Sequence, residues 1–139
     1  MVAQSQEIIL TQAILASPVQ VYAAFTRAAG WCEWCCETAE ADPCVGGILH
    51  IYTEGYNAYG EYTELEQDKM VEFTWNGDAE PPTLIRVQLD GSHDRTVLTF
   101  TVTGLGSEQD WADIAGFLER TWRRALRNLK AVLEAKTEV

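Results

Sequence analysis

The fold is decided by the segment from Gln109 to Val139, which reads QDWADIAGFLERTWRRALRNLKAVLEAKTEV. Its apolar residues recur at intervals of three and four, as they do along one face of an α-helix. These residues are Ile114, Phe117, Leu118, Trp122, Ala125, Leu126, Leu129, Val132 and Leu133. The opposite face carries Glu119, Arg120, Arg123, Arg124, Arg127, Lys130 and Lys136. The spacing therefore predicts one amphipathic helix of roughly 40 Å, at a rise of about 1.5 Å per residue.

The segments before this helix predict β-strands, because apolar and polar residues alternate along them. Candidate strands lie at residues 7–16, 48–54, 56–66, 70–76, 83–90 and 96–103. Half-polar strands joined by tight turns, such as Asn76-Gly77-Asp78, are typical of an antiparallel sheet with one solvated face. The other face needs a cover, and the long helix is the only predicted element large enough to provide one.

Two short helices are predicted after the first strand, at residues 17–26 and 28–36. Ser17-Pro18 marks the start of the first, with serine as N-cap and proline at the first helical position. The whole pattern predicts an α+β helix-grip architecture in which a curved antiparallel sheet of six or seven strands wraps around the C-terminal helix. A length of 139 residues suits one domain, so residues 1–139 are expected to form a single unit.

The composition restricts the function. With 10 Lys and Arg against 21 Asp and Glu, the formal net charge is −11, which argues against binding nucleic acid through charge. No apolar run approaches the roughly 18 residues that suggest a membrane span. The N-terminal MVAQSQEIIL lacks the pattern of a signal peptide, so a cytoplasmic protein without membrane insertion is expected.

Several short motifs occur in a characteristic order. They are Ala16-Ser17-Pro18, Val21-Tyr22, Phe25-Thr26, Trp34, Asp42-Pro43-Cys44-Val45-Gly46-Gly47, Gly60-Glu61, Phe73-Thr74-Trp75, Leu98-Thr99-Phe100, and Trp122 with Leu126, Leu129 and Leu133. In these motifs the chain resembles the START-like (Bet v 1-like, SRPBCC) helix-grip superfamily. Within it, residues 8 to 135 resemble the family named after the activator of Hsp90 ATPase homologue 1.

The resemblance implies a cavity between sheet and helix, which binds hydrophobic ligands in many relatives. Other relatives are enzymes such as polyketide cyclases, and others stimulate a chaperone. This chain departs from the pattern at Cys35-Cys36, where relatives often have another aromatic residue after Trp34.

Large apolar side chains expected to face the interior are the first candidates for a ligand site. They are Trp31, Trp34, Leu49, Ile51, Tyr59, Tyr62, Phe73, Trp75, Ile114, Phe117 and Leu118. The hydroxyls of Tyr59 and Tyr62 would orient a ligand, whereas Trp122 is assigned to the core. The alternative interpretation is that these residues simply fill the interior, since protein cores are close-packed.

Cys32, Cys35, Cys36 and Cys44 fall within thirteen residues, and Cys32-x-x-Cys35 has metal-ligand spacing. A structural zinc site usually has two separated pairs of ligands, and a second pair is missing. We therefore expect free cysteines and no cofactor, with a metal site built from these four residues as the alternative.

No catalytic residue is assigned. The chain has two histidines: His93 is expected in a solvated turn and His50 on the outer face of the sheet. Glu61 or Glu64 could act as a general base in the cavity only if a bulge reversed the strand alternation.

Three hypotheses follow, and a monomer or weak homodimer is expected in each. The first is non-enzymatic binding of a small hydrophobic ligand between sheet and helix. The second is a co-chaperone-like interaction module that uses the outer surface. The third is a cyclase- or hydrolase-like enzyme acting on an aromatic or polyketide-like substrate. A cavity without an inward carboxylate or histidine favours binding, one with such a group favours the enzyme, and a filled core favours the interaction module.

Overall fold

The computed structural model describes residues 6–78, 80–105 and 108–137. Its elements are β1 (Glu7–Ile14), α1 (Pro18–Thr26), α2 (Ala28–Trp34), β2 (Thr38–Ala41), β3 (Ile48–Thr53), β4 (Tyr56–Glu66), β5 (Met70–Gly77), β6 (Thr83–Ser92), β7 (Arg95–Gly104) and α3 (Glu108–Thr137). Residues 1–5 of the N-terminal segment, 106–107 of the loop before the last helix, and 138–139 of that helix lie outside the described residues.

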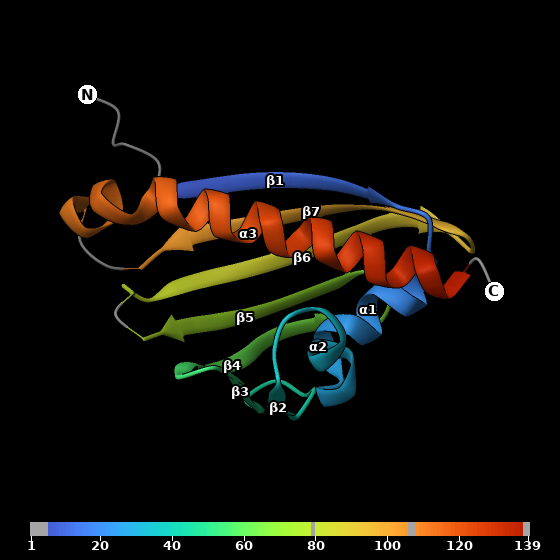
Figure 1. Cartoon of the computed structure of the whole chain (residues 1–139), viewed down its shortest axis with the longest axis horizontal. Coiled ribbons are helices and arrows are strands. Elements are labelled where there is room, and N and C mark those ends of the chain that lie inside the picture. Colours follow the sequence, from blue (N-terminus) through green and yellow to red (C-terminus); the bar gives the residue numbers. More distant parts are fainter. Residues whose placement is uncertain (1–5, 79, 106–107, 138–139) are drawn as a thin grey trace.

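The seven strands form one antiparallel sheet in the order β1-β7-β6-β5-β4-β3-β2. The sheet curves around α3, and α1 and α2 lie at one end of it (Figure 1). The predicted helix-grip fold is confirmed. The seventh strand, β2, is the one without a predicted counterpart, because the sequence TAEA is short and its residues are only partly buried.

The apolar stripe of α3 is buried against the concave face of the sheet. Leu118, Trp122, Leu126, Leu129 and Leu133 are all buried. Each such side chain contributes about 1.5 to 3 kcal/mol when it is fully removed from water, so this stripe is a principal source of stability. Within the described part of the chain, no helix combines the length and hydropathy needed to cross a bilayer.

The two short helices are fastened by specific hydrogen bonds. Ser17 and Gln20 form a reciprocal capping box at the start of α1. The Asn128 side chain of α3 donates to the carbonyl oxygen of Trp34 at 2.6 Å, which ties the end of α2 to the long helix. A Cβ atom at Gly30 would lie 2.3 Å from the carbonyl oxygen of Ala23, so α1 and α2 touch through their backbones.

Replacing Gly30 with alanine is expected to lower the free energy of unfolding by about 1 to 3 kcal/mol, because the methyl group would collide with rigid backbone. Gly116→Ala is the matched control. Its Cβ would meet only the flexible Arg120 side chain, at 3.4 Å. That change should raise stability by up to about 1 kcal/mol through helix propensity. Urea denaturation checks both variants, and a neutral Gly30→Ala would contradict the close approach of the helices.

Candidate ligand-binding site

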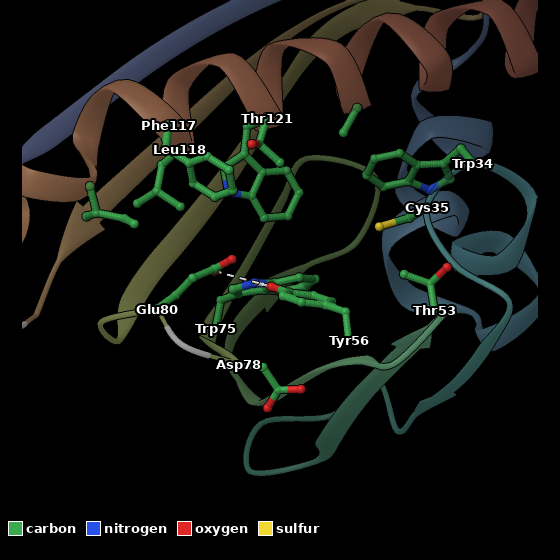
Figure 2. A pocket seen from close by; sticks show the side chains of 13 residues that line it. Trp34, Cys35, Thr53, Tyr56, Trp75, Asp78, Glu80, Phe117, Leu118 and Thr121 are labelled. Carbon is green, nitrogen blue, oxygen red and sulfur yellow. Dashed lines mark hydrogen bonds between the residues drawn. The ribbon is translucent and has the colours of Figure 1, made fainter.

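A cavity of about 540 Å³ lies between α3 and the sheet. One wall is the α3 segment from Ile114 to Ala125, the opposite side is formed by residues of β3, β4, β5 and the turn after β5, and the end of α2 closes the side (Figure 2). It is lined by Trp34, Cys35, Thr53, Tyr56, Trp75, Asp78, Glu80, Ile114, Phe117, Leu118, Thr121, Trp122 and Ala125.

Three tryptophans from different elements form the apolar walls. Trp34 comes from α2, Trp75 from β5 and Trp122 from α3, and all three are buried. The rings of Trp75 and Trp122 meet edge to face, with centroids 4.9 Å apart. Trp34 stacks on Trp31 behind the wall, with centroids 5.4 Å apart. Since each ring is held by another ring, the walls are formed before any ligand arrives.

The other side of the cavity is polar. The indole Nε1–H of Trp75 donates to the Tyr56 hydroxyl oxygen at 3.1 Å, and the Tyr56 hydroxyl donates to Glu80 Oε1 at 3.2 Å (Figure 2). Gly77 makes room for these two hydrogen bonds, because a Cβ there would lie 2.1 Å from the Tyr56 hydroxyl oxygen and 2.5 Å from Glu80 Oε1. Asp78 accepts a hydrogen bond from the backbone N–H of Asn57 at 2.8 Å.

Burial shifts the ionisation of this polar side. Desolvation raises the pKa of Glu80 above its ordinary value, the hydrogen bond from Tyr56 opposes that rise, and the nearby charge of Asp78 adds to it. Desolvation also raises the pKa of the Tyr56 hydroxyl, so it stays protonated and remains a donor at neutral pH. The Glu80 carboxylate therefore lies in a partly apolar environment, which disfavours its charged form.

Five of the residues predicted to line a pocket do line the cavity: Trp34, Trp75, Ile114, Phe117 and Leu118. Phe117 is 48% exposed, whereas Leu118 is buried. Trp122, which the sequence assigned to the core, is buried and also faces the cavity.

Five other predicted residues are buried but are not part of the cavity lining: Trp31, Leu49, Ile51, Tyr62 and Phe73. They fill the core instead. The Tyr62 hydroxyl donates to the carbonyl oxygen of Phe25 at 2.6 Å, so it is not available to orient a ligand.

The prediction that Tyr59 faces a pocket is wrong. Its side chain is 54% exposed and stacks on His50, with ring centroids 4.4 Å apart. Tyr59 and Tyr62 are three positions apart on β4 and pair with Asn76 and Phe73 of β5 in the same register, so they point to opposite faces of the sheet. Because Tyr62 points inward, Tyr59 must point outward.

The lining residues that the sequence interpretation missed include Tyr56 and Glu80. Tyr56 shares the alternation of Ala58 and Tyr62, so strand parity gave a signal for it. Glu80 follows Gly77 in the turn between β5 and β6, where no periodicity indicates direction.

The cysteines do not assemble a metal site. Cys32 and Cys36 have their sulfur atoms 3.8 Å apart, and Cys44 is exposed in the turn before β3. Among the described residues, no group of three or more His, Cys, Asp or Glu side chains could hold a metal ion. The alternative of a four-cysteine site is therefore not realised. Burial raises the pKa of the Cys35 thiol to about 12, which makes it unreactive in the cavity wall.

The carboxylates considered from the sequence point away from the cavity. A register shift does occur between Tyr62 and Glu64, but the Glu64 carboxylate pairs with Arg86 at 3.2 Å. Glu61 is exposed, as is His93 in the turn between β6 and β7.

The curved sheet, the long helix in its grip and the cavity between them define a helix-grip protein. The sequence model described as "Activator of Hsp90 ATPase homolog 1-like protein" matches residues 15–134. The chain therefore belongs to this family. No curated protein matches the sequence significantly.

Solved structures share the fold. Protein MLL2253 from Mesorhizobium loti superposes with a TM-score of 0.81 at 20% identity, covering 93% of this chain and 97% of that one. The Aha1 dimer from Colwellia psychrerythraea gives 0.77 at 25% identity, covering 92% and 96%. DynU16, a protein of the dynemicin biosynthetic locus, gives 0.78 at 19% identity, covering 94% of this chain and 48% of that one.

The raised pKa of Glu80 predicts that the effect of its replacement on the free energy of unfolding depends on pH. The pKa of Glu80 is raised in the folded chain, so folding favours the protonated side chain. Its contribution to the free energy of unfolding is fully present below the ordinary glutamate pKa and is lost as the pH rises past the raised value. Glu80→Gln cannot ionise and keeps an oxygen that accepts from Tyr56. We expect it to be more stable than the wild type at about pH 7, with the difference shrinking at about pH 4.

Urea denaturation at the two pH values measures this difference. Glu64→Gln is the control, because its carboxylate is paired with Arg86 on the outer face and its removal should give no gain at either pH. A gain for Glu80→Gln that did not depend on pH would contradict the account.

Proposed function

We propose that this protein binds one small, largely apolar ligand in the cavity between α3 and the sheet. The observation that carries the proposal is a cavity of about 540 Å³ walled by Trp34, Trp75, Trp122 and Phe117. This volume falls within the roughly 300 to 1,000 Å³ of small-molecule sites. The walls present apolar surface to this space. A ligand that covered them would remove that apolar surface from water, which favours binding.

The exposure of Phe117 supports the same proposal. It is 48% exposed on a helix whose neighbouring Leu118 and Trp122 are buried. A ligand that entered from this side would cover part of its ring and gain apolar contact area. The packed interior around Trp31 and Phe73 argues that the space is local and is not a sign of a loose core.

One observation favours catalysis as a second candidate. The Glu80 carboxylate faces the cavity with a raised pKa and a hydrogen bond from Tyr56, as a general base would. An inward carboxylate of this kind favours an enzyme acting on an aromatic or polyketide-like substrate. Against it, none of the described lining residues is Lys, Arg or His, so a developing oxyanion would find no cation. Binding remains the first proposal.

Family membership supports a chaperone partner as a further candidate, which would use the outer surface and does not require the cavity. A cytoplasmic location and a monomeric or weakly dimeric state stay predictions. An Aha1 relative has been solved as a dimer, which supports testing self-association.

A variant that fills the cavity tests the binding proposal. Thr121 is exposed and lines the cavity from α3, so Thr121→Trp should place an indole in the space with little effect on the core. We expect the affinity for 1-naphthalenemethanol, a neutral bicyclic probe, to fall by about tenfold or more, equivalent to about 1.4 kcal/mol. Isothermal titration calorimetry measures it.

Arg123→Trp is the matched control, because Arg123 lies on the solvated face of the same helix and pairs with Glu119 one turn away. It should bind the probe as the wild type does. Equal loss in both variants, or no binding by the wild type, would sink the proposal.

A further inference from the structure

The hydrogen-bond donors on the polar side of the cavity are already engaged. The Trp75 indole N–H is used by Tyr56, and the Tyr56 hydroxyl is used by Glu80. The Thr53 hydroxyl donates to Glu37 Oε2 at 3.2 Å. The strong groups left to meet a ligand here are carboxylate oxygens of Glu80 and Asp78, which are acceptors.

The charged side chains that line the cavity are negative. Glu80 and Asp78 are the charged residues of the cavity wall, and none of the described lining residues is cationic. The two carboxylates also repel each other, since the charge of Asp78 helps to raise the pKa of Glu80. A fatty acid or another anionic amphiphile would add a third negative charge, whereas a cation would relieve the repulsion.

The aromatic walls also favour a cation. The faces of Trp and Tyr rings carry partial negative charge and attract cations within about 6 Å of the ring centre, most strongly where water is excluded. Tyr56 and Trp75 stand beside Glu80, and Trp122 meets Trp75 from α3. An ammonium group at this position would meet rings and a carboxylate together.

We infer that the ligand carries a protonated amine, which binds beside Glu80 and Tyr56 while its apolar or aromatic body lies against Phe117, Leu118 and Trp122. This inference rests on the proposed function and narrows it to a class of ligand. It gives Glu80 the role of a specificity determinant, and Tyr56 that of a positioning residue that fixes the Glu80 carboxylate.

Three matched probes test the inference by calorimetry at about pH 7: 1-naphthylmethylamine as the cation, 1-naphthalenemethanol as the neutral analogue and 1-naphthoate as the anion. We expect the amine to bind about tenfold more tightly than the alcohol, and the acid more weakly than both. The preference for the amine should decrease as salt is added, because the mouth of the cavity is partly open to solvent.

The variant Glu80→Gln removes the charge and keeps an oxygen for the Tyr56 hydroxyl. In this variant the ratio of amine to alcohol affinity should fall to about one. In Glu64→Gln, which removes a carboxylate from the outer face, the ratio should stay at the wild-type value.

The outcomes separate the two proposals. Binding of the acid as tightly as the amine, or an unchanged ratio in Glu80→Gln, would overturn the amine inference and leave ligand binding standing. If none of the three probes bound the wild-type protein, the proposed function would itself fail.

Discussion

The packing of Trp122 fixes the position of α3 above the sheet, and the rest of the molecule depends on that position. Its ring lies 4.9 Å from the rings of both Phe100 and Trp75, measured between centroids. Beyond it towards the C-terminus, Leu126 and Leu129 are almost completely buried. On its N-terminal side, Ile114 and Phe117 are only partly covered and face the cavity. One helix thus serves as core along one part and as the wall of a cavity along another.

The polar side of the cavity is locally destabilised, and the stability of the rest of the fold compensates for this. Desolvation of the Glu80 carboxylate raises its pKa and reduces stability, and apolar walls that face solvent reduce it as well. Gly77 lets the Tyr56 hydroxyl reach Glu80, because it has no side chain to separate them. Arrangements of this kind, destabilised locally and fixed by their surroundings, are typical of functional sites.

The fold could be predicted because it depends on periodicity. The spacing along α3 and the alternation along β5 identify buried faces without knowledge of the partner. The strand β2 escaped prediction because four residues with two alanines give no pattern.

The site could be predicted only in part. Periodicity shows that Trp31, Trp34 and Phe73 face inward, but whether an inward residue is packed or borders a space depends on the curvature of the sheet. The orientation of Tyr59 follows from strand parity, because Tyr59 and Tyr62 are an odd number of positions apart and cannot both face inward. The approach of Glu80 to Tyr56 depends on the geometry of one turn, which residue types alone do not determine.

We propose the space between α3 and the sheet as a ligand site, and the five tryptophans allow a direct measurement of binding there. Trp34, Trp75 and Trp122 line the cavity, whereas Trp31 and Trp111 are buried and are not among the lining residues. Titration of the ¹⁵N-labelled protein with 1-naphthalenemethanol should shift the indole N–H signals of the first three and leave those of Trp31 and Trp111 nearly unchanged. Shifts of equal size in all five signals, or in none, would contradict the account.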